Sequence, residues 1–194
     1  MRKLILLAAL CIVPGCCCFE RAASSIVDAF VVGFSIANPQ ETISSLERML
    51  SLAPEVRAAR EVQLAEAFAA FEREPSEERA IWVGRRLAYL GLHATAVGWF
   101  GACLVDYPDS YRLRRHRGHR YLTLRIPVVA EWDLQRAREL AADQPDEVEP
   151  DGMPNEFGIP TSSTQGNIDY HLALAHYLQG EFDEAADAWR RCVE

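Results

Sequence analysis

The stretch "SYRLRRHRGHRYLTL", Ser110–Leu124, concentrates the side chains that could do chemistry, with five arginines and two histidines between Arg112 and Arg120. Guanidinium groups bind carboxylates through paired hydrogen bonds, and imidazole groups bind metal ions. The chain as a whole has a formal net charge of -8. This charge argues against a general nucleic-acid binder, because such proteins neutralise several phosphates with a basic surface. We therefore predict a local site and no nucleic-acid partner.

Three of these side chains share one stripe if the segment is helical. Arg112, Arg115 and His119 are spaced i, i+3 and i+7, which places them on one face of a helix. Such a face suits a carboxylate or an acidic peptide, since a guanidinium group binds a carboxylate bidentately. The alternative is that these arginines pair with acids of the chain itself, such as Glu78 or those of the acidic segment 145–165.

A metal site is the second chemistry that the histidines suggest. His116 and His119 are three residues apart, but a zinc site needs ligands that converge, usually with a third ligand close by. His171 is not expected to join His119, and the acids of segment 145–165 lack the alternating calcium-binding pattern that ends in a glutamate. We predict no bound metal. The alternative function is a metal-dependent hydrolase that uses His116, His119 and this acidic segment.

Groups for nucleophilic catalysis are not found. Lys3 is the only lysine, which excludes a Walker-type phosphate loop, a pyridoxal Schiff base and a lysine nucleophile. The stretch "GFSIA", Gly33–Ala37, looks like a nucleophile elbow, but that motif needs a strand before it and a helix after it in an α/β sheet. We therefore predict no catalytic residue and no cofactor.

The sequence repeats itself at an interval of 34 residues. Ile81–Pro108 aligns with Arg115–Ala142 at this offset, and a third copy runs from about Tyr170. Two positions of each copy take small residues, which let antiparallel helices approach closely, and larger residues fill the space beside them. The small residues are Gly84, Gly118 and Ala173 at one position and Ala96, Ala130 and Ala185 at the other, and the larger residues include Leu87 and Tyr121.

This spacing predicts pairs of helices joined by tight turns. Gly91 and Gly180 are expected in the left-handed conformation that closes a helix, and Pro127 is expected at the opening of one. The predicted helices of the first two copies are Glu78–Leu90, Leu92–Val105, Tyr111–Leu124 and Pro127–Ala141. Upstream, Pro54–Pro75 is amphipathic and is expected to pack on the first copy.

The pattern resembles the tetratricopeptide repeat (TPR), a helix-turn-helix unit, and the resemblance implies an all-α protein built as an α-solenoid. Arg125 departs from the family pattern by replacing a turn glycine, and Arg114 and Arg117 depart from it by standing where apolar residues are usual. The implied divisions are an N-terminal helical segment or degenerate repeat at 41–76, repeats at 77–110, 111–144 and 166–194, and an acidic, proline- and glycine-rich insertion at 145–165.

The resemblance also implies a concave groove that receives a protein or peptide, which here could be acidic. The residues that match the groove positions, and that we predict as the binding site, are Arg85, Tyr89, Arg112, Arg115, His119, Thr123 and Tyr170. The leading function is thus that of a binding scaffold.

The cysteines of the repeats and the C-terminal helix lead to two further predictions. Cys103 and Cys192 occupy the same position in copies that are not adjacent, so two buried, separate thiols are expected. The sequence stops after a second helix with no polar capping helix, so self-association through this C-terminal face, as a structural protein, is a third functional alternative.

The first residues, "MRKLILLAALCIVPGCCCFE", have the layout of a secretory signal. Arg2 and Lys3 precede an apolar run, Leu4–Val13, that is too short to span a bilayer as a helix.

The tetrapeptide "VPGC" within this segment resembles the lipobox of bacterial lipoproteins. The resemblance implies removal of residues 1–15, lipid attached to Cys16, and a tether at 16–40. The protein is then expected in the bacterial cell envelope, held to a membrane by its lipid and facing the periplasm or the exterior. The alternative is ordinary cleavage and secretion to the periplasm.

Overall fold

The computed structural model describes residues 48, 51–148 and 163–193, and within them the chain forms seven α-helices and no strand. The chain divides into two compact units, Met1–Gly98 and Trp99–Glu194. Among the described residues, no helix is both long enough and apolar enough to span a bilayer.

Several predicted features lie outside the described residues. These are the signal peptide at 1–15, the lipid site Cys16, the tether at 16–40, most of 41–50 and the centre of the insertion at 145–165.

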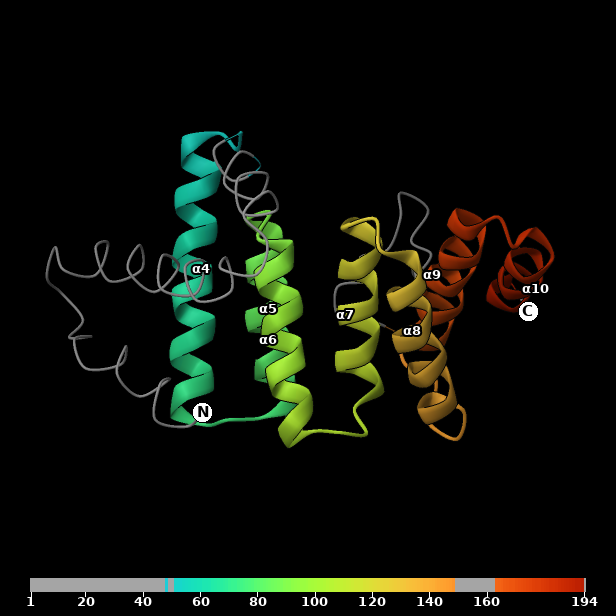
Figure 1. The fold of residues 1–194 in the computed structure, drawn as a ribbon. Coiled ribbons are helices and arrows are strands. Elements are labelled where there is room, and N and C mark those ends of the chain that lie inside the picture. The colour runs from blue at the N-terminus through green and yellow to red at the C-terminus, as the bar shows by residue number, and fades with distance from the viewer. Residues whose placement is uncertain (1–47, 49–50, 149–162, 194) are drawn as a thin grey trace, which may run out of the picture. The chain divides into compact units, whose positions relative to one another are not determined.

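The first unit is built on α4 (Pro54–Arg73) and α5 (Glu77–Tyr89) (Figure 1). The two helices pack on each other, as the amphipathic pattern predicted, and α4 contributes Leu64 and Phe68 to the buried side chains. Helix α5 begins where the Ser76 side chain accepts a hydrogen bond from the backbone N–H of Arg79 (3.3 Å). Its buried side includes Ile81 and Leu87, both almost inaccessible to solvent.

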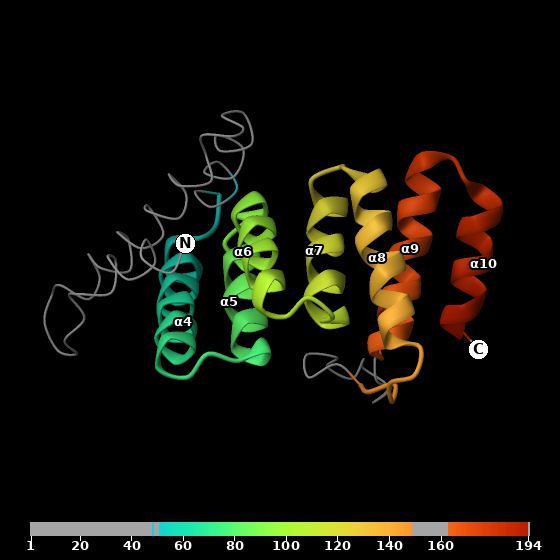
Figure 2. The same cartoon turned by 60° about the horizontal axis from the view of Figure 1, so that its bottom comes forward.

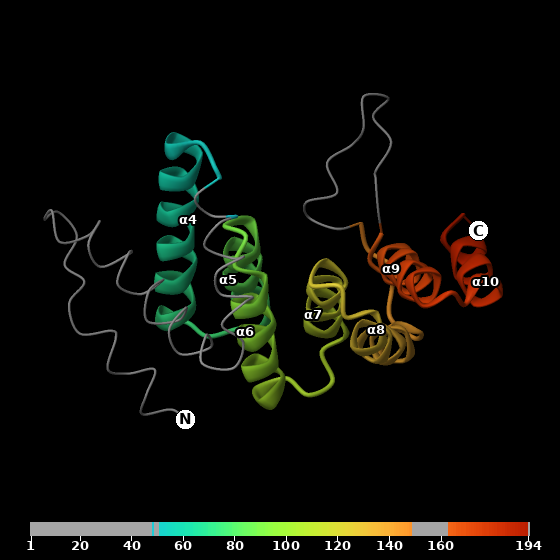
Figure 3. The ribbon, with the colours of Figure 1, turned by 45° about the horizontal axis from the view of Figure 1, so that its top comes forward.

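Helix α6 (His93–Asp106) runs from the first unit into the second, which continues with α7 (Tyr111–Thr123), α8 (Pro127–Ala141), α9 (Thr164–Gln179) and α10 (Phe182–Val193). Helices α7 to α10 lie side by side in chain order (Figure 2). Each packs on the next one, and α7 also contacts α9 (Figure 3). This succession confirms the predicted fold class, an all-α solenoid of helix-turn-helix units.

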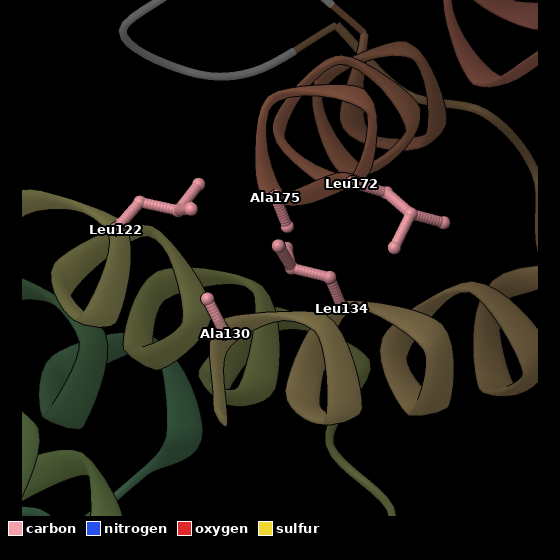
Figure 4. Close-up of a cluster of buried hydrophobic side chains, with 5 residues drawn as sticks. All are labelled: Leu122, Ala130, Leu134, Leu172 and Ala175. Carbon is pink, nitrogen blue, oxygen red and sulfur yellow. The ribbon is translucent and has the colours of Figure 1, made fainter. Parts of the chain in front are cut away.

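The small residues of the repeat lie where helices approach closely. A Cβ atom on Gly118 of α7 would stand 2.8 Å from Cγ of Leu134 on α8, which is inside van der Waals contact. A buried apolar cluster continues from there to α9 (Figure 4). Its members are Leu122 of α7, Ala130 and Leu134 of α8, and Leu172 and Ala175 of α9. This cluster fixes the spacing of the three helices that carry the candidate site.

The turns after α5, α7 and α9 share one backbone geometry. Gly91 and Gly180 have φ of 81° and 83°, as predicted, and Arg125 has φ of 61°. One backbone hydrogen bond from residue i to i−5 closes each turn: Leu92 to Leu87 (3.1 Å), Ile126 to Tyr121 (2.9 Å) and Glu181 to His176 (3.0 Å). Arg125 thus adopts the left-handed conformation that glycine adopts in the other two turns, at a conformational cost of about 1 kcal/mol.

The two ends of the insertion are tied together. Thr164 donates its backbone N–H to the carbonyl of Glu147 (2.8 Å), and Gln165 donates its own to the Asp146 carboxylate (2.8 Å). The side chain of Ser163 caps α9, which therefore begins before residue 166, the predicted start of the third copy. The helix starts early because this cap and the bridge between Val148 and Ser163 satisfy its first amides.

The two cysteines of the repeats are separate thiols, as predicted. Burial, together with the charge of Asp106, raises the pKa of Cys103 to about 12. The prediction that Cys192 is buried is wrong. It lies half-exposed in the last turn of α10, with its sulfur 3.5 Å from the carbonyl of Gly166.

Candidate functional site

One side of α7 binds a buried carboxylate of α8. Arg117 donates two hydrogen bonds to Asp133, at 2.6 and 2.7 Å, and a guanidinium nitrogen of Arg114 lies 3.6 Å from the same carboxylate. Asp133 is only 4% exposed. The hydrogen bonds that Arg117 donates to Asp133 raise the pKa of Arg117, against the effect of burial. These contacts explain why two arginines occupy positions that the repeat pattern assigns to apolar side chains.

The other side of α7 meets α9. Arg115 is 6% exposed and donates to the amide oxygen of Asn167 (3.5 Å). The rings of His119 and His171 lie 4.1 Å apart between their centroids, and Tyr170 meets His171 edge-on at 5.3 Å. We call this surface the α7–α9 face. It comprises Arg115, His119, Arg120, Asn167, Tyr170 and His171.

Two arginine charges act on His171 at the α7–α9 face. The pKa of His171 falls from its ordinary 6.5 to about 4, mainly because burial disfavours the charged ring and further because of the charges of Arg115 and Arg120. A hydrogen bond to the Asn167 carbonyl (2.8 Å) opposes the shift. Because a carbonyl only accepts, Nδ1 of His171 carries the proton and Nε2 is the acceptor. The site therefore offers arginine and tyrosine groups beside a neutral imidazole.

The structure brings together part of the predicted site. Arg115, His119 and Tyr170 meet on the α7–α9 face, and Tyr170 is 48% exposed, which leaves its ring open to a ligand. Thr123 donates its hydroxyl to the His119 carbonyl (3.1 Å), so it serves its own helix. Arg112 lies half-exposed in the first turn of α7.

The expectation that His171 stays apart from His119 is wrong. Packing of α9 against both α7 and α8 carries His171 onto the His119 ring. Nη2 of Arg120 also lies 2.7 Å from Nδ1 of His119. The 34-residue interval shows which positions of the repeats correspond, but it gives no information on which side chains of non-consecutive helices are in contact. His171 was missed for that reason.

The predicted site residues of the first unit form a cluster of their own. Arg85 donates to the hydroxyl of Tyr89 (2.8 Å), and its guanidinium lies 4.6 Å from the centre of the Trp82 ring. Arg86 lies 4.9 Å from the same ring. Trp82, which sequence reasoning missed, is therefore the centre of a cation–π cluster that holds Arg85 in place.

His116 and His119 make packing contacts. His116 is 8% exposed and stacks on Phe100, with 5.7 Å between ring centroids and 16° between ring planes. Within the described part of the chain, neither histidine belongs to a group of three potential metal ligands. Residues 149–162, which include acidic residues of the insertion, lie outside the described part of the chain.

Aromatic side chains gather on the surface at the C-terminal end. Tyr177 of α9 meets Phe182 edge-on at 5.6 Å and Trp189 at 5.9 Å, and Tyr177 and Phe182 are more than half exposed. The predicted self-association through this end would depend on these side chains.

The fold defines the class of the protein as an all-α protein of packed helix-turn-helix units. No protein-family model matches the chain, and no curated protein matches it either.

Proposed function

We propose that the chain is a tetratricopeptide-repeat protein whose α7–α9 face binds a protein or peptide through its carboxylates. The main support is the juxtaposition of Arg115 and Arg120 with a histidine that their charges help to keep neutral. A carboxylate entering this face gains charge-assisted hydrogen bonds. Tyr170 supplies an exposed ring beside them for the apolar part of a ligand.

The packing beneath the face supports a binding role. Helices α7, α8 and α9 share one apolar cluster, so the face rests on a rigid base. A pre-arranged face loses less entropy when a peptide binds than a loop would. A peptide bound there would contact both α7 and α9, because the α7–α9 face is made by both helices.

The test uses charge reversal with a matched control. Arg115→Glu combined with Arg120→Glu, both on the α7–α9 face, should weaken binding to Asp/Glu-containing peptides at least tenfold, because it replaces attraction by repulsion. The control, Arg136→Glu combined with Arg190→Glu, changes the net charge equally at exposed positions of the same unit and should bind as the unchanged protein does. Peptides with Asn/Gln in place of Asp/Glu should bind neither protein.

Because Arg115 is buried, Tyr170→Ala serves as a variant that leaves the core intact. Circular dichroism melts establish that each variant is folded before binding is measured. Equal peptide affinities for the charge-reversed and control proteins would exclude the face as the ligand site.

We also propose that the chain acts in the bacterial cell envelope, anchored by lipid on Cys16 after removal of residues 1–15. The support is the charged and apolar leader followed by "VPGC". In a bacterial expression host, a radiolabelled fatty-acid precursor should enter the native protein and not Cys16→Ser. Equal labelling of the two proteins would refute the anchor and leave secretion to the periplasm as the alternative.

A further inference from the structure

Three potential metal ligands converge at the junction of α8, α9 and the turn that follows α9. Glu131, His176 and Glu181 each place one ligand atom within 4.8 Å of the other two. We call them the α8–α9 triad. They come from three segments of the chain, and none of them belongs to the α7–α9 face.

His176 stands at a packing position where the other repeats hold one aliphatic and one phenol side chain. The 34-residue register, with the insertion removed, aligns it with Leu87 and Tyr121. It is 8% exposed, although an apolar side chain would fill this slot without the cost of burying an imidazole. The polar choice at a packing position indicates that the ring has a role other than packing.

The turn after α9 fixes Glu181 against His176. Gly180, at φ 83°, lets the chain reverse, and the backbone N–H of Glu181 donates to the His176 carbonyl (3.0 Å). This geometry brings Oε2 of Glu181 to 2.6 Å from Nδ1 of His176. The carboxylate and the imidazole are thus aligned by the backbone.

Glu131 is oriented by two neutral amides. Gln135, one turn further along α8, donates to one carboxylate oxygen (2.7 Å), and Gln179 of α9 donates to the other (2.7 Å). Amide donors that orient a ligating carboxylate are a recurrent feature of metal sites. The residues next to Glu131 and His176, Ala130 and Ala175, belong to the apolar cluster that fixes the separation of α8 and α9 (Figure 4).

No arginine neutralises the Glu131 carboxylate of the triad within the described residues. Among the described residues, no arginine lies within 4 Å of the Glu131 carboxylate, and the ion pair of Glu181 is with His176. Asp133, only two residues beyond Glu131 on the same helix, has two arginines on its carboxylate. Two carboxylates held this close repel each other, and a divalent cation between them removes the repulsion.

We propose that the α8–α9 triad binds a divalent transition-metal ion, with Zn²⁺ as the representative ion. One imidazole nitrogen and two carboxylate oxygens form a mixed donor set of the kind zinc accepts, whereas calcium and magnesium favour oxygen ligands alone. Three protein ligands leave a fourth position of the tetrahedral ion for water or for a group of a bound partner. The ion joins α8 to the α9–α10 turn.

The test is zinc titration of the untagged, chelator-treated full chain, followed by calorimetry. One Zn²⁺ should bind per chain, and Glu131→Gln and His176→Gln should each weaken binding at least tenfold, since each removes a ligand. Glu139→Gln is the matched control, because it removes a carboxylate from the exposed side of the same helix. Its zinc affinity should equal that of the unchanged protein.

Cobalt distinguishes the triad from the cysteines of the chain as the metal site. Co²⁺ in the triad should give visible d–d absorption without the near-ultraviolet bands of thiolate ligation, and the absorption should be lost in His176→Gln. Circular dichroism confirms that each variant is folded. The proposal is overturned if no zinc binds, if Glu131→Gln and His176→Gln bind zinc as tightly as Glu139→Gln does, or if the cobalt spectrum is that of thiolates.

Discussion

The two sides of α7 use the same residue type in opposite ways. On the side that faces α8, Arg114 and Arg117 share the buried carboxylate of Asp133. On the side that faces α9, Arg115 donates to an amide and Arg120 approaches an imidazole. Burial lowers the pKa of His171 there, and the charges of the two arginines lower it further. An arginine whose charge is neutralised inside the fold stabilises the fold. The arginines on the α9 side act instead on an uncharged imidazole.

Removing the carboxylate on the α8 side should have the largest effect. Asp133→Asn leaves two guanidinium groups in a largely buried space without their counter-charge, which should lower the free energy of unfolding by about 3 kcal/mol. Urea denaturation followed by circular dichroism measures it. Glu139→Gln, which breaks the exposed pair with Arg136, should cost less than about 0.5 kcal/mol. Similar losses for both variants would contradict the stabilising role of the buried Asp133 carboxylate on the α8 side of α7.

On the α9 side, stability should depend on pH through His171. Its pKa is about 4 in the folded chain and 6.5 ordinarily, so between these values the unfolded chain binds a proton that the folded chain does not. The contribution is complete above pH 6.5 and is lost as the pH falls toward 4. Between pH 7 and pH 4.5 the loss should be about 2 kcal/mol.

The variant His171→Gln isolates the contribution of His171 to the pH dependence of the unfolding free energy. The difference in unfolding free energy between native protein and variant should change across the same pH range, because the other titrating groups are common to both. A constant difference, or an NMR titration of His171 near 6.5, would show that burial and the neighbouring arginine charges do not lower the pKa of this ring.

The smallest effect concerns the close approach of α7 to α8. Gly118→Ala should destabilise the protein by about 1 kcal/mol, because overlap of the new methyl group with fully buried Leu134 outweighs the gain in helix propensity. Gly101→Ala is the control, since its Cβ would lie 3.4 Å from Arg117 Nη1, an ordinary contact. It should stabilise the protein by up to about 1 kcal/mol, and thermal melts that show the same sign for both would contradict the close approach.

The helices could be predicted from sequence because their signals are local. Periodic apolar residues, the positions of Gly91 and Gly180, and Pro127 at the start of α8 gave the bounds of α5 to α8 to within two residues. Helix α9 begins at Thr164, two residues before the third copy, and the ties between residues 144–148 and 163–165 that fix this start are made across an insertion that has no repeat.

The candidate site was harder to predict because its contacts join different helices. Arg114 and Arg117 were recognisable as unusual because they occupy positions where the repeat takes apolar residues. Their partner, Asp133, lies on another helix, and no sequence pattern identifies it as the partner. The neighbourhood of His171 depends likewise on the packing of α9 on α7, and the grouping of Glu131 with His176 on the packing of α8 on α9. Local patterns predict elements, whereas these pairs depend on the rotation of each helix about its axis.

The contacts at the base of the insertion make the stability of α8 and α9 largely independent of the length and composition of the insertion. Val148 bridges Ser163, and the side chain of Gln165 donates to the carbonyls of Ala141 and Gln144. The entropy of closing a loop between two fixed ends grows only with the logarithm of its length, by roughly 0.6 kcal/mol per doubling. A peptide inserted between Val148 and Ser163 should therefore cost α8 and α9 little stability, because the ties on either side of it belong to the described residues and do not depend on its length.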